Sequence, residues 1–74
     1  MAGKEVLMDK QALKGLIVIN DGKQEVLAAA MGMSLSRLNA KINETDTEFT
    51  KSEIEFIRDR YKMSRKQVMD IFFS

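Results

Sequence analysis

The feature that most constrains the fold is the stretch of residues 24–43, QEVLAAAMGMSLSRLNAKIN. It holds two helical patterns with almost nothing between them, an alanine-rich one that stops at Gly32 and a second that starts directly after Ser34. Glycine favours a helix stop because it adopts left-handed backbone angles without a steric penalty, and serine is a preferred N-cap. The sequence therefore predicts two short helices at one tight corner, packed so closely that a side chain larger than the methyl group of Ala28 would collide.

The apolar residues of this stretch recur at helical spacing and predict its inner face. They are Leu27, Met31, Met33, Leu38 and Ile42. Met33 is also spaced to pack on Leu38 as a hydrophobic staple, which would set the direction of the second helix. The other positions of the second helix form a polar, basic outer face, namely Leu35, Ser36, Arg37, Asn39, Ala40 and Lys41.

This arrangement is typical of a helix-turn-helix, whose second helix enters the DNA major groove. The sequence resembles DNA-binding domains of the Cro and lambda-repressor type, above all small temperate-phage regulators from Gram-positive hosts. The resemblance covers roughly residues 13–73 and is carried by Gln24, Ala28, Gly32, Ser34, Leu38 and Asn43, with the later FTKSEIEFIRD and the final IFF.

The resemblance implies a sequence-specific regulator, a repressor or Cro-like protein, with recognition helix 34–42 in the major groove of a palindromic operator. The implied DNA-binding residues are Lys23, Gln24, Ser34, Leu35, Ser36, Arg37, Asn39, Lys41 and Asn43. Lys23, Gln24 and Asn43 are expected to contact phosphates. Arg37 and Asn39 are expected to make most base contacts, because arginine matches guanine and asparagine matches adenine.

Some positions depart from the family pattern. Lys23 stands where a serine or threonine cap is usual, Gly22 where an apolar residue is common, and Lys41 where an aliphatic residue is frequent. Leu35 is unusual on a reading helix and would either touch a thymine methyl group or pack. It favours an alternative function, an antirepressor or modulator that uses the same fold to bind another regulatory protein.

Three further helices are predicted, so the expected fold is all-α, a compact bundle of five short helices containing the helix-turn-helix. The first helix should start behind Asp9, a plausible N-cap, and end near Asn20. Capping boxes mark the starts of the fourth and fifth helices, Thr50 with Glu53 and Ser64 with Gln67. Residues 1–8 are interpreted as a flexible N-terminus and residues 9–74 as one DNA-binding domain.

Composition narrows the possible functions. The chain of 74 residues contains no cysteine and no histidine, which removes thiolate metal ligands, the commonest zinc ligand and the commonest general base. We therefore expect no enzyme activity, no metal and no cofactor. No apolar run reaches the length of a membrane span, so the expected location is the cytoplasm, at the nucleoid of a bacterial host.

The net charge of +1 by itself argues weakly against a nucleic-acid partner, but the charges are segregated along the chain. Residues 34–43 hold two basic and no acidic side chains, residues 44–55 five acidic and one basic, and residues 58–67 five basic and one acidic. Such segregation would allow a basic face toward DNA, because phosphate attraction acts within about a Debye length. The alternative is an ordinary solvated surface.

The last two helices carry more large apolar residues than a small core readily covers, namely Phe56, Met69, Phe72 and Phe73. Uncovered aromatic residues often mark an interface. The two interpretations are a self-association surface and plain core. A homodimer would suit the function, because two recognition helices can read half-sites about 34 Å apart.

Overall fold

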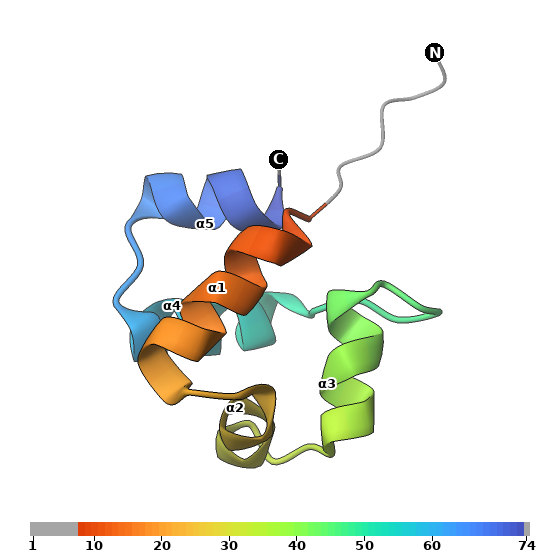
Figure 1. Ribbon diagram of the computed structural model, residues 1–74. Helices are drawn as coiled ribbons and strands as arrows, with labels where there is room; N and C mark the ends of the chain where they lie inside the picture. Colours follow the sequence, from red (N-terminus) through yellow and green to blue (C-terminus); the bar gives the residue numbers. More distant parts are fainter. Residues whose placement is uncertain (1–7, 74) are drawn as a thin grey trace.

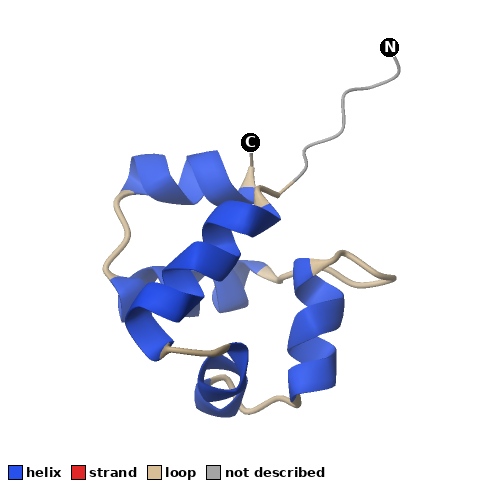
Figure 2. Ribbon diagram, in the orientation of Figure 1, coloured by secondary structure: helices blue, strands red, loops and turns tan. Residues whose placement is uncertain are grey.

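The computed structural model describes residues 8–73, and within this range the chain forms five helices and no strand (Figure 1; Figure 2). The helices are α1 (Lys10–Asp21), α2 (Gln24–Ala30), α3 (Leu35–Ile42), α4 (Lys51–Tyr61) and α5 (Arg65–Phe72). The predicted all-α fold with five short helices is confirmed. Residues 1–7, predicted to be a flexible N-terminus, lie outside the described residues, whereas Met8 packs against the core.

The starts of four helices follow from their predicted caps. Asp9 and Ser34 accept hydrogen bonds from the backbone N–H three residues ahead, each at 3.1 Å. Thr50 and Ser64 begin full capping boxes. In each box the cap hydroxyl accepts the backbone N–H of the third helical residue, whose side chain in turn accepts the backbone N–H of the cap. The exception is α2, whose cap Lys23 makes no such bond, because an ammonium group can only donate. The local signals are thus sufficient to place α1, α3, α4 and α5.

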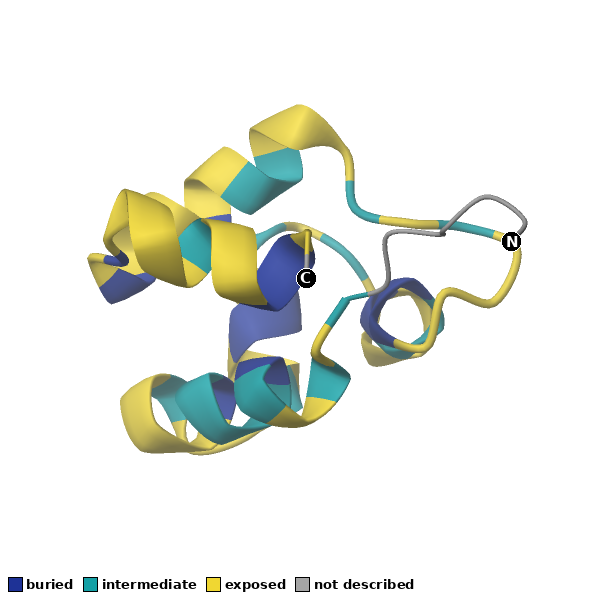
Figure 3. Cartoon of the chain, turned by 90° about the horizontal axis from the view of Figure 1, so that it is seen from above, coloured by how far each residue is buried: buried dark blue, intermediate teal, exposed yellow. Residues whose placement is uncertain are grey.

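Every helix or its flank contributes to one apolar core, and buried positions recur along the inward sides of the helices (Figure 3). The buried core residues are Leu13, Ile17, Leu27, Ala28, Leu38, Ile42, Ile57, Tyr61, Met63, Ile71 and Phe72. Phe72 is only 6% exposed, and its ring meets that of Phe49 edge to face with centroids 5.7 Å apart. The prediction that Phe72 belongs to a dimer interface is therefore wrong, because its ring is used within the core.

Two polar contacts connect the ends of helices distant in sequence. The N–H of Asp9 donates to the carbonyl of Ile71 at 2.7 Å, which joins the start of α1 to the end of α5. At the other end of α1, the carboxylate of Asp21 accepts both Nε and Nη2 of Arg60, at 3.1 and 2.8 Å, and the hydroxyl of Tyr61. The Arg60 hydrogen bond lowers the pKa of Asp21, while burial and then Asp21 raise the pKa of Tyr61.

None of the helices in the described part of the chain combines the length and the apolar character that a membrane span requires. Residues 8–73 also bring together no cluster of three or more potential metal-ligating histidine, cysteine or carboxylate side chains.

Candidate nucleic-acid interface

The corner between α2 and α3 is built as the sequence predicts. The N–H of Met33 donates to the carbonyl of Ala28 at 3.0 Å, and the N–H of Gly32 to that of Ala29 at 3.1 Å. These paired bonds close a helix around a left-handed residue, and Gly32 has a φ of 73°. A Cβ atom at Gly32 would meet nothing within 4 Å, so glycine is favoured here by backbone angle and not by space.

The N-terminal half of α3 is accessible, whereas its second half is largely covered. Leu35, Ser36 and Arg37 are all exposed, whereas Leu38 and Ile42 are fully buried. Asn39 and Ala40 are half-buried on the flanks. The structure therefore presents one short ridge, with Arg37 as its exposed basic side chain.

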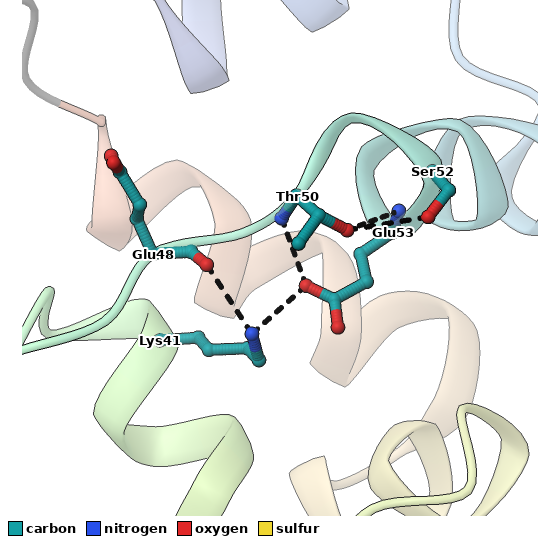
Figure 4. A network of polar contacts seen from close by, with 5 residues as sticks. All are labelled: Lys41, Glu48, Thr50, Ser52 and Glu53. Carbon is teal, nitrogen blue, oxygen red and sulfur yellow. Dashed lines mark hydrogen bonds and ion pairs between the residues drawn. The ribbon is translucent and has the colours of Figure 1, made fainter.

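Lys41 is the main correction to the predicted site. It was expected to face DNA, but it is only 2% exposed, and Figure 4 shows its ammonium group between α3 and the start of α4. Its Nζ lies 3.0 Å from Oε1 of Glu53 and donates to the carbonyl of Glu48 at 3.2 Å. Lys41 lies one turn after buried Leu38, on the inward side of α3. The aliphatic residue usual at this position in the resembled family was a signal of that inward orientation.

Glu53 has two roles at this contact (Figure 4). Its carboxylate accepts the backbone N–H of Thr50 at 2.9 Å, which completes the capping box of α4, and it also pairs with Lys41. Burial raises the pKa of Glu53, but the Thr50 bond and the Lys41 contact together outweigh burial and leave that pKa lowered. The same carboxylate thus starts α4 and holds the second half of α3. Only the local capping part of this role was predicted.

The other predicted phosphate contacts remain accessible to different degrees. Lys23 and Asn43 are exposed, and Gln24 is half-buried. Lys23 lies 3.6 Å from Glu25 in a solvent-exposed pair. The loop that follows α3 carries the exposed acids Glu44, Asp46 and Glu48. Since Lys41 is paired inside the protein, the positive potential beside α3 is smaller than its sequence predicts.

The four residues predicted to form a self-association surface do not lie together. Phe56 faces a small hollow beside Ala30 and Met31, whereas Met69 and Phe73 line a groove between α4 and α5. With Phe72 in the core, a single four-residue patch is excluded. The groove contains three further apolar side chains that were not predicted to belong to this surface, Phe49, Ile54 and Val68.

Comparison with protein-family models, with curated proteins and with solved structures found no match to this chain.

Proposed function

We propose that the protein is a sequence-specific DNA-binding transcriptional regulator, in which α2 and α3 form a helix-turn-helix and α3 enters the major groove. The observation that carries the proposal is the exposed start of α3, with Leu35, Ser36 and Arg37 outward and Leu38 buried. In helix-turn-helix proteins the N-terminal residues of the second helix contact base edges. In α3 the second half is buried against the protein and the first half is exposed, which suits contact with base edges.

The chemistry of each exposed side chain suggests a role. Arg37 would read guanine through its two-pronged guanidinium group, and Leu35 would contact a thymine methyl group. Lys23, Gln24 and Asn43 would place the motif on phosphates, which fix register without reading sequence. Lys41 has no DNA contact in this proposal and instead holds α3 against α4. Occupying a promoter would exclude RNA polymerase, and the resemblance to phage repressors supports this last step.

The test begins with selection of bound sequences from random duplex DNA. At the selected site, Arg37→Ala should weaken binding by about 1–3 kcal/mol and relax preference at one base pair. Lys66→Ala removes the same charge from α5, where the side chain is exposed, and should leave base preference unchanged. Binding should also weaken steeply with salt. Equal effects of the two substitutions, or selection of no consensus, would refute the proposed reading face.

A second candidate function is a modulator that binds another regulatory protein through the α3 face. Exposed Leu35 and the inward orientation of Lys41 favour it, because together they make this face more apolar and less basic. The neighbouring acids at 44–48 also oppose phosphate. A protein partner would show little of the salt dependence that DNA binding requires, so salt titration distinguishes the two functions.

A further inference from the structure

An open apolar groove lies between α4 and α5, and its volume is about 680 Å³. Its apolar lining is Phe49, Ile54, Val68, Met69 and Phe73. Met69 is 51% exposed and Phe73 47% exposed, so two large apolar side chains face water on this surface. Sites for small molecules are typically hollows of about 300–1,000 Å³ with a mostly apolar lining and a few polar groups that orient the ligand. The groove has the size and the lining of such a site.

The charged side chains of the lining are distributed unequally between the two ends of the groove. One end lies where a short loop joins α4 to α5 (Figure 1), and it carries Arg58 from the last turn of α4 and Arg65 from the first turn of α5. The other end, at the start of α4, carries the acidic Glu48 and the basic Lys51, and Glu55 lies between the two ends. Among the described residues no ion pair engages either arginine. Two guanidinium groups are therefore free to bind an anion at one end of the groove.

We propose that the groove binds a single, monomeric alkyl carboxylate, whose anionic group pairs with Arg58 and Arg65 while its chain lies along the apolar lining. The planar guanidinium group matches a carboxylate through two parallel hydrogen bonds. Burial of each methylene group of the chain against Val68 and Met69 adds a favourable hydrophobic contribution. The α5 wall of the groove has eight residues and is about 12 Å long, so the length of chain that it can cover is limited.

The acidic residues of this face favour one small anion over a broad anionic surface. Glu48 and Glu55 line the same groove as the arginines, and Asp70 is exposed directly after Met69 in the sequence. An anionic membrane or a strongly acidic protein segment would meet these carboxylates as well as the arginines, and like charges repel. A ligand with one charged group places that group at the arginine end and only apolar atoms elsewhere.

The groove is separate from the candidate DNA surface. Its lining comes from residues 48–58 and 65–73, and none of it comes from α1, α2 or α3. The inference therefore does not rest on the proposed function. A chain that binds the carboxylate but selects no DNA sequence would support the ligand site and refute the DNA-binding proposal, and the reverse result would do the opposite.

The site is tested with the full chain, labelled with ¹³C at its methionine methyl groups and titrated with decanoate below the concentration at which micelles form. The methyl signal of Met69 should shift and saturate, while that of Met33, which lies outside the groove at the corner between α2 and α3, should not. Decanol has the same chain without the charge and should bind about tenfold more weakly or worse. Among carboxylates of increasing length, affinity should rise about two- to fourfold per methylene group and then level off when the chain exceeds the groove.

Variants measured by calorimetry separate the two halves of the ligand. Arg58→Gln and Arg65→Gln should each weaken decanoate binding about three- to tenfold and leave decanol binding unchanged. Lys62→Gln is the matched control, because Lys62 is an exposed cation of the loop between α4 and α5 that does not line the groove; decanoate binding should not change. Phe73→Ser should weaken the binding of both ligands, because it removes part of the apolar lining.

Four results would overturn the proposal. The first is a Met69 signal that does not saturate, and the second is equal affinity for decanoate and decanol. The third is a loss of affinity in Lys62→Gln as large as in the arginine variants. The fourth is a different occupant: cosedimentation with phosphatidylglycerol vesicles in the absence of decanoate binding would identify a membrane, and a Met69 response that disappears as protein concentration rises would identify a second copy of the chain.

Discussion

Removing one partner of the ion pair between Lys41 on α3 and Glu53 on α4 should destabilise the protein more than removing the other, because the two side chains are buried to different extents. Lys41 is 2% exposed, while the side chain of Glu53 is 21% exposed. Removing the acid leaves a buried ammonium group without its counter-charge. Removing the base leaves a carboxylate that still accepts the N–H of Thr50 and still reaches water. Glu53→Gln should therefore destabilise the protein more than Lys41→Met.

The magnitudes follow from the contacts. Breaking a buried ion pair by removing one partner costs about 3–5 kcal/mol, whereas replacing it by apolar groups of similar volume is often neutral. Lys41 would keep its bond to the Glu48 carbonyl, so Glu53→Gln should cost about 2–3 kcal/mol, and Lys41→Met about 1 kcal/mol or less. The double variant should resemble Lys41→Met, because no unpaired charge remains.

Urea unfolding followed by circular dichroism measures this difference. With an m-value of about 1 kcal/mol/M, the midpoints of the two single variants should lie about 1–2 M apart. The pair Lys66 and Asp70 is the control, because both side chains are largely exposed; Lys66→Met and Asp70→Asn should leave the midpoint nearly unchanged. A Glu53→Gln midpoint equal to or above that of Lys41→Met would refute the reasoning.

Three further predictions concern packing, backbone angle and pH. Ala28→Leu should cost about 1–3 kcal/mol in urea unfolding because Ala28 is buried where α2 meets its neighbours, while Ala29→Leu, at an exposed position, should not. Both Gly32 and Lys62 have a positive φ, which glycine adopts more easily than other residues. Gly32→Ala should therefore lower the free energy of unfolding by about 1 kcal/mol, and Lys62→Gly should raise it by up to about 1 kcal/mol. Thermal melts should show a lower melting temperature for the first variant and a higher one for the second. The lowered pKa of Asp21 gives stability that is complete above about pH 5 and is lost as pH falls through the folded-state pKa, so Asp21→Asn should flatten the acid side of a plot of melting temperature against pH.

The ridge at the start of α3 was predictable from its immediate neighbours. Ser34 accepts the N–H of Arg37, and this one turn orients Leu35, Ser36 and Arg37 away from Leu38. The prediction needed only helical periodicity and a capping rule. Whether this ridge contacts DNA depends on a partner molecule, and it stays a prediction.

The aromatic residues of the last two helices show the limit of the same rules. Phe72 and Met69 were both predicted as interface residues because the last two helices carry many large apolar side chains, but Phe72 is buried and Met69 is half-exposed. The difference depends on Phe49, which comes from the segment before α4 and packs edge to face on Phe72. Phe56 lies at a separate hollow beside α2. Sequence spacing within one helix carries no information on which other helix lies opposite.

By itself the sequence determined where α1, α3, α4 and α5 begin and where α1 and α2 end, because capping bonds and left-handed stops join residues only three to five positions apart. The tertiary structure alone decided that Lys41 points inward, since the charge that makes its burial tolerable belongs to Glu53 on another helix. It also decided that Met69 and Phe73 share a groove with Ile54, while Phe56 does not. These outcomes depend on how α3, α4 and α5 pack against one another. Interactions between residues close in sequence do not specify that packing.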